Sequence, residues 1–91
     1  MSLDILVIDD EADIRALVAG VLEDEGYTAR MAANSDAALA AIRARRPSLV
    51  LLDVWLTGST LDGLELLEEI KRRDATIPVL MISGHGNLDT A

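Results

Sequence analysis

The 91 residues contain no cysteine and no phenylalanine, and tryptophan and tyrosine occur once each. Without cysteine, disulfide bonds and thiolate metal sites are excluded. No apolar run is long enough to span a membrane, and no basic segment precedes the first apolar residues, as a signal peptide would require. The formal net charge of −8 argues against binding nucleic acid through its phosphates. These absences favour a cytoplasmic domain that does not contact a membrane.

Aliphatic and helical segments alternate along the chain. Near-continuous aliphatic runs occupy residues 5–8, 49–52 and 79–82, and a weaker run lies around 27–32. Runs of this kind are typical of parallel strands that are buried on both faces. The segments between them carry apolar residues at helical spacing. This order predicts one α/β domain in which each helix crosses between parallel strands.

Capping residues indicate where the three helices begin and end. The first helix carries its apolar residues from Ile14 to Leu22, and Gly26 follows where a C-terminal cap belongs. Ser35 is the expected N-cap of the second helix, which should stop before Pro47. The third helix should end near Arg73.

Each of three strands ends in a side chain that carries oxygen. Asp9 and Asp10 follow the run at 5–8, Asp53 follows the run at 49–52, and Ser83 follows the run at 79–82. In a parallel α/β sheet, ligands bind outside the carboxyl ends of the strands, where the strand order reverses. If the first two of these runs are neighbours, the three carboxylates converge, and a cation is needed to offset their repulsion. Mg²⁺ prefers such oxygen ligands.

A simpler interpretation explains only some of these carboxylates. Acidic residues at 10–13 would favour the positive N-terminus of the first helix whether or not a metal binds. Asp53 lies far from that helix in the sequence and is left unexplained. We therefore expect a metal site formed by Asp9, Asp10 and Asp53.

Four stretches together resemble the receiver domains of two-component response regulators: "LVIDDE" at 6–11, "LVLLDVWL" at 49–56, "DGLELLEEIK" at 62–71 and "PVLMISGHG" at 78–86. The resemblance covers residues 1–91, and the end of the chain looks most like receivers attached to sigma-54-dependent transcription activators. It implies a flavodoxin-like, doubly wound parallel sheet with strand order 2-1-3-4. A family member has a fifth strand, which would lie outside this chain.

The resemblance also implies a role for each residue at the strand ends. Asp53 would accept a phosphoryl group from a phosphohistidine on a sensor histidine kinase. Asp10 would bind Mg²⁺ directly and Asp9 through water, and the backbone carbonyl of Trp55 would complete the protein ligands. Ser83 would be the switch hydroxyl that moves toward the phosphoryl oxygens. The phosphorylated domain would switch a downstream, transcriptional output, and DNA would be contacted only through regions outside this chain.

Two departures from the family pattern lead to further expectations. The loop after Asp53 lacks the usual proline, and Gly63 follows Asp53 by ten residues, which is longer than the family spacing. We therefore expect a longer and looser loop. The family's fifth strand and fifth helix, with a lysine and the aromatic partner of the switch, are not in this sequence. We therefore expect either that these residues are part of a longer chain or that they associate, for example as a dimer, through an open apolar edge at 79–82.

Two other functions remain open. The altered loop is compatible with a degenerate receiver that acts only as a protein-interaction module. Less favoured is an aspartyl-phosphate phosphatase, which also uses Mg²⁺ and an aspartate at a strand end. Such enzymes typically carry a second aspartate two residues after the nucleophile, where this chain has Trp55. We expect a phosphoacceptor with weak self-dephosphorylation, not an enzyme.

Overall fold

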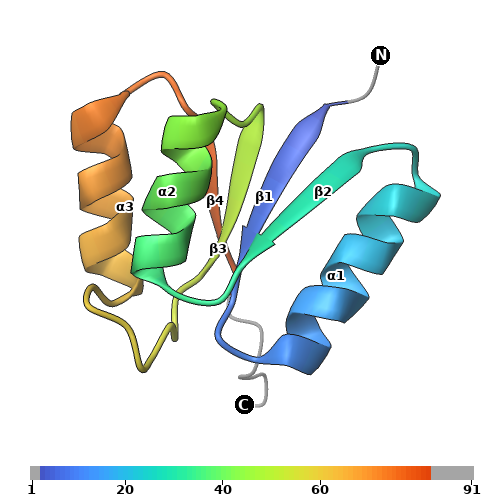
Figure 1. The fold of residues 1–91 in the computed structure, drawn as a ribbon, viewed down its shortest axis with the longest axis horizontal. Coiled ribbons are helices and arrows are strands. Elements are labelled where there is room, and N and C mark those ends of the chain that lie inside the picture. Colours follow the sequence, from blue (N-terminus) through green and yellow to red (C-terminus); the bar gives the residue numbers. More distant parts are fainter. Residues whose placement is uncertain (1–2, 83–91) are drawn as a thin grey trace.

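The computed structural model describes residues 3–82, which form a parallel four-stranded sheet with a helix after each of its first three strands. The strand order is β2-β1-β3-β4. Helix α1 lies on one face of the sheet, and α2 and α3 lie side by side on the other (Figure 1). The elements are β1 (Asp4–Ile8), α1 (Ala12–Asp24), β2 (Thr28–Ala32), α2 (Ser35–Ala44), β3 (Leu49–Asp53), α3 (Gly63–Arg73) and β4 (Val79–Ile82). The predicted flavodoxin-like fold and its 2-1-3-4 order are confirmed.

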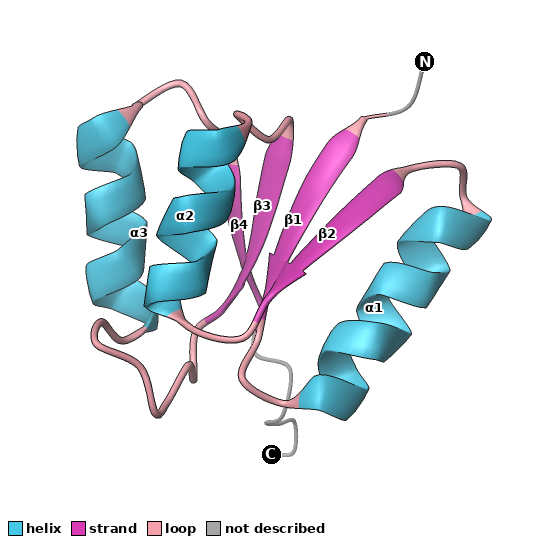
Figure 2. Cartoon of the chain, viewed as in Figure 1, coloured by secondary structure: helices cyan, strands magenta, loops and turns pink. Residues whose placement is uncertain are grey.

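Both faces of the central strands are buried, which explains why their sequences are continuously aliphatic. In β1, Leu6 and Ile8 belong to the core beneath α2 and α3, together with Leu66. Ile5 and Val7 belong to a smaller core on the side of α1. Alternate residues of a strand point to opposite faces, so the central strands supply side chains to both cores. Figure 2 shows the helices that cover the two faces of the sheet.

The first helix ends as its sequence predicts. Gly26 has a φ of +93°, a left-handed conformation that is strained for residues with a Cβ atom. Its N–H donates to the Glu23 carbonyl at 3.0 Å, and the Tyr27 N–H donates to the Leu22 carbonyl at 3.1 Å. These two bonds are the Schellman motif that stops a helix at a glycine.

The N-cap of the second helix lies one residue earlier than the sequence predicts. Asn34, not Ser35, is the N-cap, and its side chain accepts a hydrogen bond from the Ala37 N–H at 2.8 Å. Both residue types cap helices well, so the sequence pattern alone does not separate them. Ser35 is completely buried at the first position of α2, and its hydroxyl bonds elsewhere, as described below.

Helical spacing overestimates how much of α1 is buried. Val18 and Leu22 pack against the smaller core, but Leu17 is 64 % exposed and Val21 is 56 % exposed. Leu80 of β4 is also 55 % exposed. Between residues 3 and 82, no helix is both long and apolar enough to cross a membrane.

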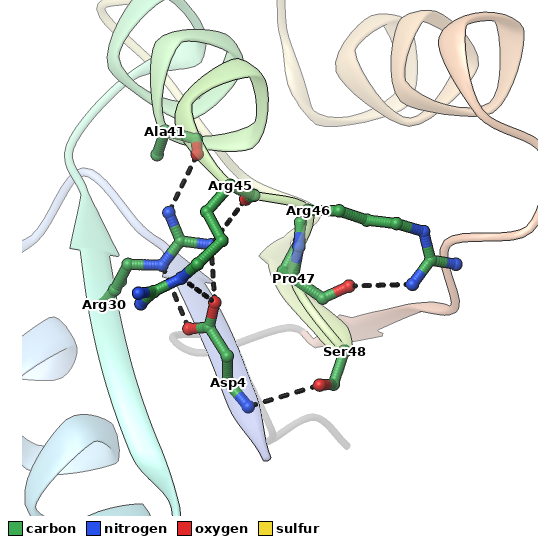
Figure 3. A network of polar contacts seen from close by, with 7 residues as sticks. All are labelled: Asp4, Arg30, Ala41, Arg45, Arg46, Pro47 and Ser48. Carbon is green, nitrogen blue, oxygen red and sulfur yellow. Dashed lines mark hydrogen bonds and ion pairs between the residues drawn. The ribbon is translucent and has the colours of Figure 1, made fainter. Parts of the chain in front are cut away.

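An ion-pair network of Asp4, Arg30 and Arg45 lies at the end of the sheet where β1 begins (Figure 3). The guanidinium of Arg30 in β2 donates to both carboxylate oxygens of Asp4, at 2.9 and 2.8 Å. The same group donates to the carbonyls of Ala41 and Arg45, each at 2.8 Å, and so satisfies carbonyls at the end of α2. Arg30 thus ties two strands to one helix.

Candidate acidic site

Three carboxylates meet at the other end of the sheet, where β1 and β3 finish. Asp9 and Asp10 follow β1, and Asp53 is the last residue of β3, which is hydrogen-bonded to β1 in parallel register. One carboxylate oxygen from each residue can be chosen so that all three lie within 4.8 Å of one another. Asp9 and Asp53 are fully buried, and Asp10 is half-buried. The predicted convergence of these residues is confirmed.

Tight local turns hold two of the carboxylates. Oδ1 of Asp9 accepts from the Glu11 N–H at 2.9 Å, and Oδ1 of Asp53 accepts from the Trp55 N–H at 2.9 Å. Bonding of an aspartate to the backbone two residues ahead is the Asx-turn. The backbone of Asp9 is also fixed, because its N–H donates to the Ala32 carbonyl and its carbonyl accepts from Arg15.

The donor set fits a hard divalent cation. Oδ2 of Asp9 and Oδ1 of Asp10 are buried, and neither has a hydrogen-bond partner among residues 3–82. Burying a carboxylate oxygen without a partner is costly, and a cation that takes oxygen ligands would remove that cost. Asp13 lies in the first turn of α1, as the simpler interpretation expects, but that interpretation does not account for Asp53 at the end of β3.

The remaining predicted site residues are not tested by these contacts. The side chain of Trp55 is 58 % exposed, and its N–H bonds to Asp53. The role of its carbonyl as a metal ligand stays a prediction. Ser83 lies outside the described residues, as does the rest of the segment that follows β4.

Residues of the loop between β3 and α3 belong to the site, and sequence reasoning missed them. The Thr57 hydroxyl donates to Oδ2 of Asp10 at 2.8 Å. The expected looseness of the loop is not what the contacts show, since Ser59 and Leu61 are both hydrogen-bonded to Ser35. The signal available in the sequence was the density of hydroxyl residues in "TGST" at 57–60.

Gly63 contacts the end of β3 despite the longer loop. A Cβ atom at this position would lie 2.8 Å from the carbonyl oxygens of both Asp53 and Val54. Asp62 and Glu65 form a capping box that begins α3 at the same place. The additional loop residues are therefore accommodated before Asp62, and the glycine keeps α3 close to the acidic site.

A hollow of about 360 Å³ lies beside the site. The hollow is lined by residues of the loop and of the start of α3: Val54, Trp55, Leu56, Thr57, Asp62 and Leu64. The three clustered aspartates are not among these lining residues. Trp55 both lines the hollow and bonds to Asp53 through its N–H.

Comparison with known proteins identifies what this arrangement resembles. The family model described as "Response regulator receiver domain" matches residues 5–91. The nitrogen assimilation regulatory protein NtrX of Azorhizobium caulinodans is 65 % identical over 91 residues, covering 100 % of this chain and 20 % of that protein. Sporulation initiation phosphotransferase F of Bacillus subtilis is 41 % identical over 85 residues, covering 93 % of this chain and 67 % of that protein.

A solved structure gives the same result. The crystal structure of the receiver domain of NtrX from Brucella abortus superposes with a TM-score of 0.87 at 64 % identity, covering 92 % of this chain and 70 % of that one. The chain spans about a fifth of the length of the curated NtrX relatives that it matches. The family model covers nearly the whole sequence, and the parallel sheet carries the acidic cluster at the expected strand ends. This chain therefore belongs to the response regulator receiver domain family and closely matches the NtrX receivers.

Proposed function

We propose that this domain accepts a phosphoryl group on Asp53 from a phosphohistidine of a sensor histidine kinase. The observation that carries the proposal is the convergence of Asp53 with Asp9 and Asp10 at the ends of two neighbouring strands. The Asx-turn at Trp55 fixes Oδ1 of Asp53 and thereby orients the whole carboxylate. A carboxylate held in this way is a suitable nucleophile for phosphoryl transfer.

In the proposed step, an oxygen of Asp53 forms a bond to phosphorus while the phosphorus–nitrogen bond of the donor breaks. The electron pair of that bond remains on the imidazole nitrogen, and Asp53 becomes an acyl phosphate. Mg²⁺, held by Asp9, Asp10, Asp53 and the Trp55 carbonyl, would supply charge neutralisation to the phosphoryl oxygens. Asp9 and Asp10 offer it the two buried oxygens for which residues 3–82 supply no hydrogen-bond partner.

The proposal extends to the output of the domain. The Ser83 hydroxyl would move toward the phosphoryl oxygens and carry the switch, and the phosphorylated form would regulate a transcriptional output through other regions of a longer protein. The similarity to NtrX proteins, which are described as regulatory, supports this assignment. A cytoplasmic location and dimerisation through the 79–82 edge complete the proposal.

Labelling with acetyl phosphate distinguishes this function from its alternatives. A phosphoacceptor should form one adduct for each protein molecule, only when Mg²⁺ is present, and should release phosphate slowly. A phosphatase of the aspartyl-phosphate class would release many equivalents of phosphate without a lasting adduct. An interaction-only module would form no adduct and release no phosphate, and either of these results would reject the proposal.

A further inference from the structure

Hydrogen bonds of hydroxyl groups connect the loop at 54–62 to distant parts of the chain. Thr57 Oγ1 donates to Asp10 Oδ2 at 2.8 Å. Ser59 Oγ accepts from the Ser35 N–H at 2.7 Å, and Ser35 Oγ accepts from the Leu61 N–H at 3.0 Å. The three bonds link residues 47, 24 and 26 positions apart. They therefore specify one arrangement of the loop relative to β1 and α2.

Ser35 is central to this arrangement because Asn34 performs the capping. The Asn34 side chain satisfies the Ala37 N–H, so the Ser35 hydroxyl is available to the loop. The Ser35 N–H has no intrahelical acceptor at the first position of α2, and Ser59 supplies one. Ser35 is fully buried, which strengthens both bonds. The reciprocal pair holds the loop just beyond Thr57.

The bond from Thr57 reaches a residue that the proposed function uses as a metal ligand. Oδ2 of Asp10 accepts from the Thr57 hydroxyl, while Oδ1 is buried and has no hydrogen-bond partner within the described part of the chain. A hydrogen bond to one oxygen of a carboxylate restricts its rotation and leaves the other oxygen for the cation. Such orienting bonds commonly change metal affinity by about 10- to 100-fold.

We propose that Thr57 is a positioning residue that orients the Asp10 carboxylate for Mg²⁺, and that the Ser35–Ser59 pair holds the loop that presents Thr57. This inference rests on the proposed function, since it requires that the acidic site binds Mg²⁺. In this role Thr57 acts through Asp10 and not on the acceptor Asp53. It acts on the affinity for the metal and leaves the acceptor step intact once the site is filled.

Mg²⁺ titrations of Thr57→Val and Thr57→Ser proteins test the inference. Binding is measured by calorimetry and by Trp55 emission at constant ionic strength. Valine keeps the shape of threonine without its hydroxyl, so the dissociation constant should rise by about tenfold or more. Serine restores the hydroxyl and should return the constant close to that of the parent. Ser59→Ala keeps the Thr57 hydroxyl but releases the loop, and should weaken binding by less than Thr57→Val.

Thr60→Val is the matched control, because Thr60 lies in the same loop and its hydroxyl makes only a 3.4 Å contact with Asp36. The Thr60→Val protein should bind Mg²⁺ with the same affinity as the parent protein. The rate of labelling by acetyl phosphate provides a second readout. The Thr57→Val protein should be labelled more slowly than the parent at low Mg²⁺, and at a rate that approaches that of the parent at saturating Mg²⁺. A loss that persists at saturation would overturn the inference.

The titrations also separate this inference from the proposed function. If the parent binds Mg²⁺ and Thr57→Val binds it equally well or more tightly, the positioning role is wrong while the metal site stands. Tighter binding would mean that the hydroxyl competes with the cation. If the parent shows no binding, the metal site of the proposed function fails, and the role of Thr57 fails with it.

Discussion

Single residues decide the shape of the acidic site. Asp9 and Asp53 each bend back onto a backbone N–H two residues ahead, and Gly63 lets α3 begin against the end of β3. The carboxylates could be predicted because they follow aliphatic runs directly in the sequence. Thr57 could not, because its contact with Asp10 joins residues 47 positions apart through an irregular loop. No periodic pattern in the sequence predicts a contact of this kind.

Gly63→Ala should destabilise the domain. The added methyl group would meet two backbone carbonyl oxygens at 2.8 Å, and backbone atoms cannot move away as a flexible side chain can. We expect a loss of about 1–3 kcal/mol in the free energy of unfolding. Chemical denaturation monitored by circular dichroism measures this loss.

Gly20→Ala is the matched control for that substitution. Gly20 lies inside α1, and a Cβ atom there would meet nothing within 4 Å. Alanine is a better helix former than glycine, so this variant should gain about 0.5–1 kcal/mol. Equal effects of the two substitutions would contradict the close approach of α3 to β3.

The helices and strands follow their sequence signals closely, and the exceptions have physical causes. Gly26 ends α1 through a Schellman motif, and β1 is aliphatic because two helical layers cover it. The N-cap of α2 was misplaced by one residue because Asn34 and Ser35 are both good caps. Only the bond from Ser35 to the loop, which is a tertiary contact, separates them.

The network that joins β1, β2 and α2 should make stability depend on pH in acid. Burial raises the pKa of Asp4, but hydrogen bonds and charge from Arg30 and Arg45 outweigh it and hold the pKa below its usual 3.8. The carboxylate of the folded protein therefore binds a proton less readily than that of the unfolded chain. Its contribution is fully present above pH 3.8 and is lost as the pH falls through the lower, folded pKa.

Asp4→Asn tests this contribution. The variant should be less stable than the parent at neutral pH, and the difference should shrink as the pH falls below 3.8. Urea denaturation at a series of pH values measures both quantities. A difference that stays constant from neutral pH into this acid range would show that the Asp4 charge does not act as described.

At the scale of the whole molecule, the helices among residues 3–82 cover the two faces of the sheet unequally. Within residues 3–82, α2 and α3 lie over one face and α1 lies over the other (Figure 2). Among residues 3–82, β4 is bonded to β3 only, and Leu80 is largely exposed. The resemblance to the family implied the strand order that places β4 beside β3. The sequence did not predict that Leu17 and Val21 of α1 would be exposed, because helical spacing does not show how wide a face is covered.

We expect the edge of β4 that is unpaired within residues 3–82 to support self-association of this chain. Exposed apolar edge strands are templates for pairing with another chain, and a charge placed on them prevents it. Leu80→Lys should therefore reduce the concentration dependence of the molecular mass measured by sedimentation. Leu17→Lys makes the same change at a similarly exposed leucine of α1 and should not reduce it. A parent protein that stays monomeric at all concentrations would contradict this role for the edge.

The central claim is that Asp53 accepts the phosphoryl group within the site formed with Asp9 and Asp10. Intact-mass measurement after incubation with acetyl phosphate and Mg²⁺ tests it most directly, with Asp53→Asn compared to Asp62→Asn. Asparagine at 62 keeps a good N-cap for α3 and removes a nearby carboxylate outside the cluster. We predict one phosphoryl adduct on the parent and on Asp62→Asn, and none on a folded Asp53→Asn protein. An adduct of equal yield on Asp53→Asn would contradict the account.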